Sequence, residues 1–266
     1  MNYLQSCLFL LVSFLASVAG AICGIGGGVI IKPTLDLFGW LSVSAISFLS
    51  GCTVLSMSCY SVGKSLLAGE KSVDLHTGTP MAVGAAIGGV VGKNLFSLVS
   101  GQFENRNAVG AVQAACLLVI TLGTLVYTLN KAKIRPLRVR RLVPCLAVGL
   151  ALGVMSSFLG IGGGPINLVV LGYLFGMDSK TAAANSLYII LFSQATSLCA
   201  TLLSGSVPEF QPLTLLLMVA GGILGGIVGR IVNKRLDNRA VDKLFVVLMA
   251  VIIGISAYNT WQYAHF

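Results

Sequence analysis

Long continuous runs of apolar residues, separated by short polar stretches, form the dominant pattern along this chain. Several of the runs have about 20 residues, the length that an α-helix needs to cross the hydrocarbon core of a bilayer. Because the runs are continuous rather than alternating, they predict helices and not the strands of a closed barrel. The predicted spans are 43–67, 78–100, 108–129, 180–204, 212–232 and 243–263.

Two further apolar stretches, 3–39 and 142–176, are each interrupted by the pentapeptide Gly-Ile-Gly-Gly-Gly, at 24–28 and at 160–164. A straight helix over 3–39 would be about 55 Å long, whereas the hydrocarbon core measures about 30 Å. We therefore expect a hairpin in each stretch, with a long arm, a glycine turn inside the membrane and a short return arm.

The two halves of the chain repeat each other. A shift of 136 residues places Gly24 on Gly160 and Ser50 on Ser186. The repeats cover 1–129 and 142–266 and are joined by a basic linker at 130–141. The predicted fold is an all-α integral membrane protein of two inverted repeats, each a glycine-broken hairpin followed by three transmembrane helices. A shift of 137 aligns a second set of glycines, which we interpret as helix-packing positions: Gly84, Gly88, Gly89 and Gly92, with Gly221, Gly225, Gly226 and Gly229.

Composition agrees with a membrane protein, since 56% of the residues are hydrophobic and only 9% are charged, against about 25% charged in soluble domains. The expected location is the plasma (inner) membrane, with several crossings and the lipid bilayer as a partner. The net charge of +9 would suggest nucleic acid in a soluble protein. Here the basic residues lie in short loops that set orientation, so no nucleic-acid partner is expected.

Charge placement favours the hairpins. If each interrupted stretch returns to its starting side, 14 of the 17 basic residues fall on one side, and only Lys32, Lys93 and Arg106 are left on the other. If each stretch crosses once, the linker and the basic loop at 233–243 fall on opposite sides. The positive-inside rule prefers the hairpins, with both termini outside and the linker in the cytoplasm. An arrangement of eight full spans is the alternative.

The glycine turns are the candidate functional feature. Transporters with inverted repeats bring broken helices together near the midplane and direct their positive N-termini at anionic groups. Pro165 fits this interpretation, because proline is favoured at the first position of a helix. Tight helix packing is the alternative role. The candidate substrate-binding glycines are Gly26, Gly27, Gly28, Gly162, Gly163 and Gly164.

Charged and polar side chains narrow the substrate. All eight carboxylates fall at predicted segment ends or in loops, which disfavours a cation carrier, because such a carrier is expected to keep an acid inside. Lys32 either faces the anion or extends to the surface; for Lys93 the surface is favoured. Polar residues inside the spans either bind an oxyanion or join helices. Those chosen as candidate ligands are Ser50, Asn167, Asn185 and Ser186, together with Lys32.

The stretches "GIGGGVIIKPTL" from Gly24 and "GIGGGPINLVVL" from Gly160 resemble the sulfite exporter TauE/SafE family of membrane transporters, of the 4-toluene sulfonate uptake permease type. The second copy departs from the family pattern, since its proline is Pro165 and Val169 occupies the usual proline position. The resemblance implies transport of sulfite, sulfoacetate or a related sulfonate, in most proposals outward. Only the glycine turns are carried over as site residues.

We therefore expect a transporter, most simply an exporter, for a small organosulfur or inorganic sulfur anion. An anion channel, or an uptake permease for another small anion, is the alternative. A membrane enzyme using Cys23 and Cys59 is disfavoured, because the two histidines, His76 and His265, lie at segment edges. No catalytic residue, metal ligand or cofactor is expected, and a homodimer is left open.

Overall fold

The computed structural model describes residues 3–70, 72–102, 106–139 and 141–265, with side chains omitted at 106–108 and 264–265. Lys71, Glu104 and Arg140, which entered the charge count above, lie outside the described residues. The described residues form helices and connecting turns without a strand, and eight of these helices are long and apolar enough to span a membrane. The predicted all-helical membrane class is confirmed.

Each half has five helices, of which the second is the shortest, with 11 residues. The first half consists of α1 (Tyr3–Cys23), α2 (Gly28–Phe38), α3 (Val43–Leu67), α4 (Leu75–Gln102) and α5 (Arg106–Asn130). A short 3₁₀ turn, η1 (Lys131–Lys133), leads into the linker. The second half consists of α6 (Leu142–Leu159), α7 (Pro165–Phe175), α8 (Ser179–Leu203), α9 (Pro212–Arg235) and α10 (Asn238–His265).

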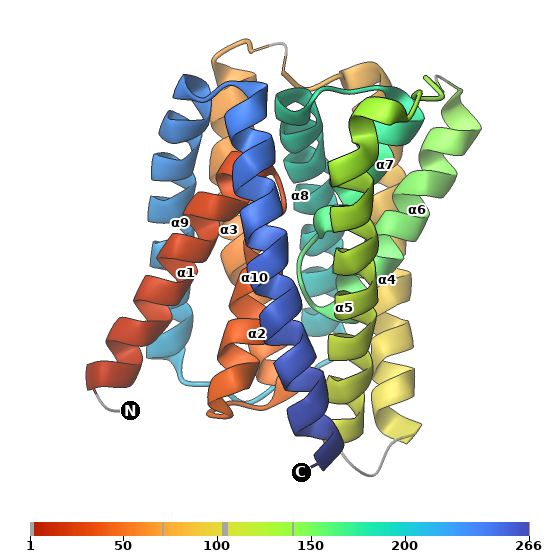
Figure 1. The fold of residues 1–266 in the computed structure, drawn as a ribbon. Helices are drawn as coiled ribbons and strands as arrows, with labels where there is room; N and C mark the ends of the chain where they lie inside the picture. The colour runs from red at the N-terminus through yellow and green to blue at the C-terminus, as the bar shows by residue number, and fades with distance from the viewer. Residues whose placement is uncertain (1–2, 71, 103–105, 140, 266) are drawn as a thin grey trace.

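Helices α1 and α2 form a hairpin, since α2 runs back toward the end of the molecule at which α1 begins (Figure 1). Helix α2 has 11 residues, about 16 Å of helix, which is about half of a bilayer core. The α6–α7 hairpin opens toward the opposite end (Figure 1), and α7 also has 11 residues. The helices are thus interrupted at each glycine pentapeptide, between α1 and α2 and between α6 and α7.

The short arms of the two hairpins, α2 and α7, each end at a glycine. Gly39 follows α2 with φ 63° and Gly176 follows α7 with φ 69°, the left-handed conformation that stops a helix. The next helix in each half then begins at a polar N-cap. The side chain of Ser42 accepts a hydrogen bond from the amide of Ala45, and that of Asp178 accepts from the amide of Lys180.

Helix α10 begins five residues earlier than the apolar pattern predicts. The carboxylate of Asp237 accepts a hydrogen bond from the amide of Ala240, 2.9 Å away, and this N-cap satisfies the first turn. Asp242 and Lys243 therefore lie on the helix rather than in the loop before it. The hydrophobic run marks only the part of a helix that lipid can cover, so capped polar turns extend beyond it.

The long arm of each hairpin packs against a helix of the other half. Helix α6 packs on α4 and α1 packs on α9, while α5 pairs with α10 and α3 with α8. Glycines make the closest approaches: a Cβ on Gly88 would lie 2.3 Å from the carbonyl oxygen of Leu150, and one on Gly225 would lie 2.5 Å from that of Phe14. The second set of glycines therefore lies at helix contacts, as the spacing predicts.

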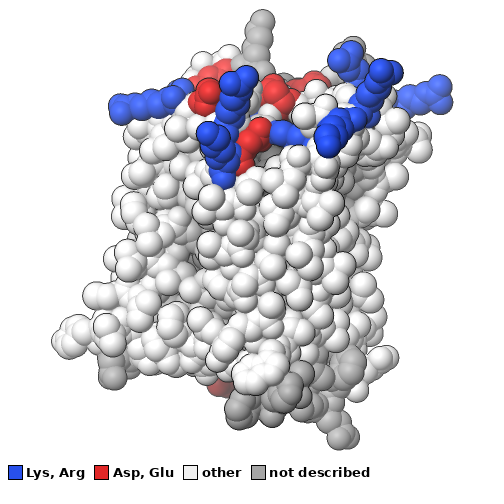
Figure 2. All heavy atoms as spheres, in the orientation of Figure 1, with Lys and Arg blue, Asp and Glu red and all other residues white. Residues whose placement is uncertain are grey.

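Both termini lie at one end of the molecule and the α5–α6 linker lies at the other (Figure 1). On the face drawn in Figure 2, the Lys and Arg side chains gather at the linker end and the long body below them is almost free of charge. We call the end with the linker the basic end and the end with the termini the opposite end.

Candidate functional site

The two glycine turns lie in the interior and depend on backbone angles that side chains rarely adopt. In the first turn, Gly26 has φ 83° and Gly27 has φ 71°; in the second, Gly162 has φ 66° and Gly163 has φ 106°. Residues with a Cβ are strained at such angles. The glycines thus permit two sharp turns at a depth where irregular backbone must be buried in protein or line a cavity.

The turns contact each other directly. A Cβ on Gly28 would lie 2.0 Å from the carbonyl oxygen of Ile161, and one on Gly26 would lie 2.8 Å from that of Gly162. Backbone from the first half therefore touches backbone from the second, with no room for a methyl group between them. The six candidate glycines, which sequence alone placed in two separate segments, meet in one layer that we call the turn layer, residues 24–28 and 160–164.

Helices α2 and α7 both begin in the turn layer and run away from it toward opposite ends. In the described chain, no backbone carbonyl accepts a hydrogen bond from the amide N–H groups of Gly27, Gly28, Gly163 or Gly164. The first amides of a helix carry a partial positive charge and bind anions readily. Two such helix starts in one layer make it electropositive without any charged side chain.

Ser50 and Ser186, which the repeat relates to each other, both lie against the turn layer. Ser50 is fully buried, its hydroxyl has no hydrogen-bond partner, and it lies 2.9 Å from the position of a Cβ on Gly28. The hydroxyl of Ser186 donates to the carbonyl oxygen of Gly24, 2.5 Å away, and the side-chain amide of Asn167 donates to Ser186 over 3.3 Å. The hydroxyl of Ser50 is thus free to form a further hydrogen bond, whereas that of Ser186 is already used.

Two apolar side chains that sequence reasoning missed fill the rest of the layer. Val54 lies 2.8 Å from the position of a Cβ on Gly162, and Ile190 lies 2.3 Å from that of a Cβ on Gly163. They come from α3 and α8, one turn after Ser50 and Ser186, and the repeat aligns them. The sequence did contain a signal for these two side chains, because each lies one helical turn beyond one of the two matched serines.

Lys32 does not extend to the surface. It is only 3% exposed, and its ammonium donates to the hydroxyl of Ser47 at 3.0 Å and lies 3.8 Å from the carboxylate of Asp36. Asp36 lies near the end of α2, at a segment end as expected, but it is only 8% exposed, so one carboxylate does lie inside the protein. The pair lies one helical turn apart on α2, so each charge compensates the other inside the protein.

Asn185 lies apart from the turn layer, although it neighbours Ser186 in sequence. Its side-chain oxygen accepts from the amide of Asp74, and its amide group donates to the carbonyl oxygens of Ser72 and Thr181. These contacts join the start of α4 to α8 and use the whole side chain. Asn185 therefore holds helices together in this structure, which is the alternative role considered for it.

A cavity of about 450 Å³ opens on the basic end. Its lining includes Ala183, whose Cα lies 2.3 Å from the position of a Cβ on Gly24, so this residue separates the cavity from the first glycine turn. Glu70, on the loop between α3 and α4, forms ion pairs with Arg230 at 2.8 Å and Lys234 at 2.7 Å. With Lys180, the cavity is lined by three cations and one carboxylate.

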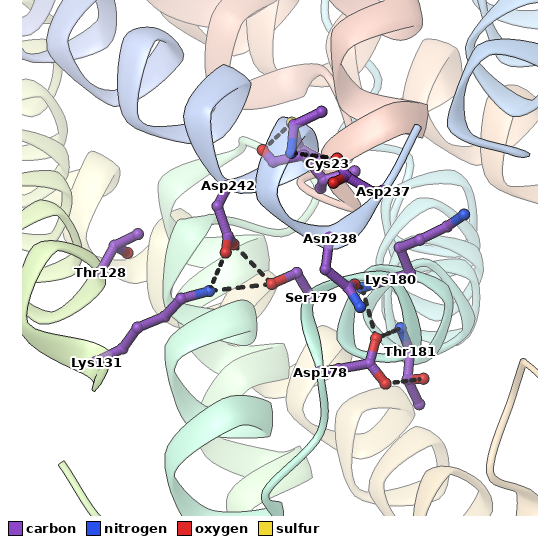
Figure 3. Close-up of polar contacts among 12 residues, drawn as sticks. Cys23, Thr128, Lys131, Asp178, Ser179, Lys180, Thr181, Asp237, Asn238 and Asp242 are labelled. Carbon is purple, nitrogen blue, oxygen red and sulfur yellow. Dashed lines mark hydrogen bonds and ion pairs between the residues drawn. The ribbon is translucent and has the colours of Figure 1, made fainter. Parts of the chain in front are cut away.

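Beside this cavity, a polar network fixes the first turns of α8 and α10 (Figure 3). The ammonium of Lys131 and the hydroxyl of Ser179 both donate to the carboxylate of Asp242, the latter at 2.6 Å. The amide of Lys180 donates to the side chain of Asn238 over 3.0 Å. The network ties the linker to both helices and leaves the cavity mouth between α3, α8 and α9.

Comparisons with known proteins identify relatives that match most of the chain. A sequence profile of the family described as "Sulfite exporter TauE/SafE" matches residues 9–256. A protein of Bacillus subtilis (strain 168) called "Probable membrane transporter protein YunE" is 25% identical over 236 residues, which covers 75% of this chain and 79% of that protein. No solved structure matches the chain.

Proposed function

Because the chain belongs to the sulfite exporter TauE/SafE family of membrane transporters, we propose that it carries a small sulfur oxyanion, such as sulfite, sulfoacetate or a related sulfonate, out across the plasma membrane. The anion binds at the turn layer. The observation that carries this proposal is the buried, unpartnered hydroxyl of Ser50 beside the start of α2. A hydroxyl and unpaired amides are the donors that an oxyanion accepts.

The basic end is assigned to the cytoplasm by the positive-inside rule. The 450 Å³ cavity then opens to the cytoplasm and ends at Ala183, which packs against Gly24 of the turn layer. Its three cations exceed its one carboxylate, so a potential of positive sign draws anions inward from the cytoplasm. An interior-negative potential favours anion export by about 2.3 kcal/mol per charge for each 100 mV.

Two inverted repeats account for the arrangement of the arms. The paired contacts of α4 with α6 and of α9 with α1 support a two-fold relation between the halves. In this proposal the repeats cover 1–129 and 142–266, and the turn layer is their common interface. A homodimer stays a prediction, which crosslinking of the protein in its membrane tests.

Flux of anions into and out of proteoliposomes tests the proposal. Wild-type protein should move at least one of sulfite, sulfoacetate, thiosulfate and sulfate with saturable kinetics. Ser50→Ala should raise the half-saturating concentration by about tenfold, the loss expected for one hydrogen bond to a charged group. Ser58→Ala is the matched control, because Ser58 is equally buried and unpartnered but lies two turns further along α3. Equal half-saturating concentrations for the two variants would contradict binding of the anion at the turn layer.

A carrier is favoured over a channel because the two glycine turns meet in direct backbone contact and close the layer between the two ends. On the opposite side, the cavity that adjoins Gly160 has only about 30 Å³, about the volume of one water molecule. Large unitary currents in a planar bilayer would instead favour the channel. Flux that runs inward against the anion's electrochemical gradient would favour an uptake permease.

A further inference from the structure

The small cavity of about 30 Å³ on the opposite side of the turn layer is lined mainly by polar side chains. Ser44 and Ser47 come from the start of α3, and Thr201 comes from the end of α8, which places the cavity toward the opposite end. Lys93 of α4 provides its charge. Polar groups facing one another inside a membrane protein are expensive, and they commonly mark a route for polar substrates.

Lys93 differs from the basic residues that form ion pairs in the structure. Lys32 has Asp36, Lys131 has Asp242, and Arg230 and Lys234 share Glu70. In the described chain no carboxylate lies within 4.0 Å of the Lys93 ammonium, which instead lies 5.3 Å from the centre of the Phe96 ring. A half-buried cation without a fixed counter-ion favours the arrival of a mobile anion.

The cavity also contains polar atoms with no partner. The hydroxyl of Ser157 is buried and makes no hydrogen bond, and neither does the side-chain oxygen of Gln113. The amide group of Gln113 is already used, since it donates to the carbonyl oxygen of Phe158 at 2.6 Å. Ser157 can therefore donate to an anion, while the free oxygen of Gln113 can accept from the ammonium of Lys93.

The cavity begins where the turn layer ends. Its lining includes Gly51, the neighbour of Ser50, and Gly160, the first glycine of the second turn. Ser47 joins the two regions, because it accepts a hydrogen bond from Lys32 and its hydroxyl lies 2.4 Å from the position of a Cβ on Gly160. An anion that leaves the turns away from the cytoplasmic cavity meets this lining next.

We propose that Lys93 and Ser157 form a second anion site, on the outer side of the turn layer, which binds the same class of small oxyanion after it leaves the glycine turns. This proposal rests on the proposed function. At about 30 Å³ the site is contracted in this structure, in which the cytoplasmic cavity is open. Outward opening of the hairpins enlarges it, so the two sites bind the anion in alternation.

Flux measured separately from each face of the membrane tests this site. In Lys93→Met the half-saturating concentration of sulfite should rise about tenfold on the outer face, the loss expected for one charge-assisted hydrogen bond. On the cytoplasmic face it should stay within twofold. Lys93→Arg should keep the outer value close to wild type, because it keeps the charge. Lys64→Met is the control for loss of one charge, since Lys64 lies exposed in the last turn of α3 at the basic end.

If Lys93→Met leaves the half-saturating concentration of sulfite on the outer face unchanged, the second site is overturned. An equal rise in this concentration on both faces would also overturn it. If wild-type protein moves no anion, the proposed function fails, and the site is then judged by binding in detergent. A sulfite-dependent rise in melting temperature that Lys93→Met abolishes and Ser50→Ala retains supports the site in that case. A rise that Lys93→Met leaves intact overturns it.

Discussion

Gly28 and Ile161 bring the two halves of the chain into direct backbone contact: a Cβ on Gly28 would lie 2.0 Å from the carbonyl oxygen of Ile161. Gly28 is not among the glycines with positive φ, so its requirement for glycine arises from this contact and not from backbone strain. Any side chain at this position must push the two turns apart.

Gly28→Ala should therefore reduce anion flux by more than tenfold, because separation of the turns displaces the amides and Ser50 together. A methyl group forced into a closely packed site costs about 1–3 kcal/mol, which corresponds to about 5- to 150-fold in an equilibrium. Gly63→Ala is the control, since nothing lies within 4 Å of the position of its Cβ. Wild-type flux in Gly28→Ala would show that the turns need not touch.

Gly88→Ala should lower the melting temperature of the purified protein. The added methyl would lie 2.3 Å from the carbonyl oxygen of Leu150, so α4 and α6 must separate, at a cost of about 1–3 kcal/mol. Gly123→Ala should be neutral or slightly stabilising, because its methyl has open space and alanine favours helix. Equal melting temperatures for the two variants would contradict close packing of α4 on α6.

Lys32→Met should destabilise the protein by about 3–5 kcal/mol, the usual cost of leaving one charge of a buried pair alone. The double variant Lys32→Met with Asp36→Asn should recover a large part of this loss, because it removes both charges. Unfolding by denaturant in detergent measures both. If the double variant is as unstable as the sum of the single variants, the two side chains do not act as a pair.

Glu70 should make stability depend on pH. The hydrogen bond from Lys234 lowers the pKa of Glu70 below its usual value of 4.5; burial opposes this, and the nearby charge of Arg230 lowers the pKa further. A lowered pKa gives stability that is present above about pH 4.5 and is lost as the pH falls through the pKa of the folded state. The effect should be about 1 kcal/mol or less, because the pair is partly exposed.

Melting temperatures between pH 7 and pH 3.5 check this expectation, with Glu70→Gln as the comparison. The difference between wild type and the variant should shrink as the solution becomes more acidic. A difference that stays constant over the range would assign the loss of stability at low pH to other carboxylates.

Sequence alone was enough for the class of fold and for the two breaks, since continuous apolar runs and repeated glycines carry that information locally. It was not enough for Asp36, because the pattern places this residue near a segment end and only the three-dimensional fold buries it against Lys32. Asn185 and Ser186 are neighbours in sequence, yet one joins α8 to α4 and the other touches Gly24. Contacts between residues more than 100 positions apart are set by helix packing, which a periodic pattern does not encode.

The thinness of the turn layer has an electrical consequence. In the proposed orientation, a water-filled cavity would carry the potential of the cytoplasm inward, so the membrane voltage would fall mainly across the protein between Ala183 and Gly160, which line the two cavities. A voltage that is spread over about 30 Å of lipid elsewhere is concentrated here into a much shorter distance. The backbone dipoles of the two turns lie in that strong local field, which makes their relative position sensitive to voltage even when no ion is bound.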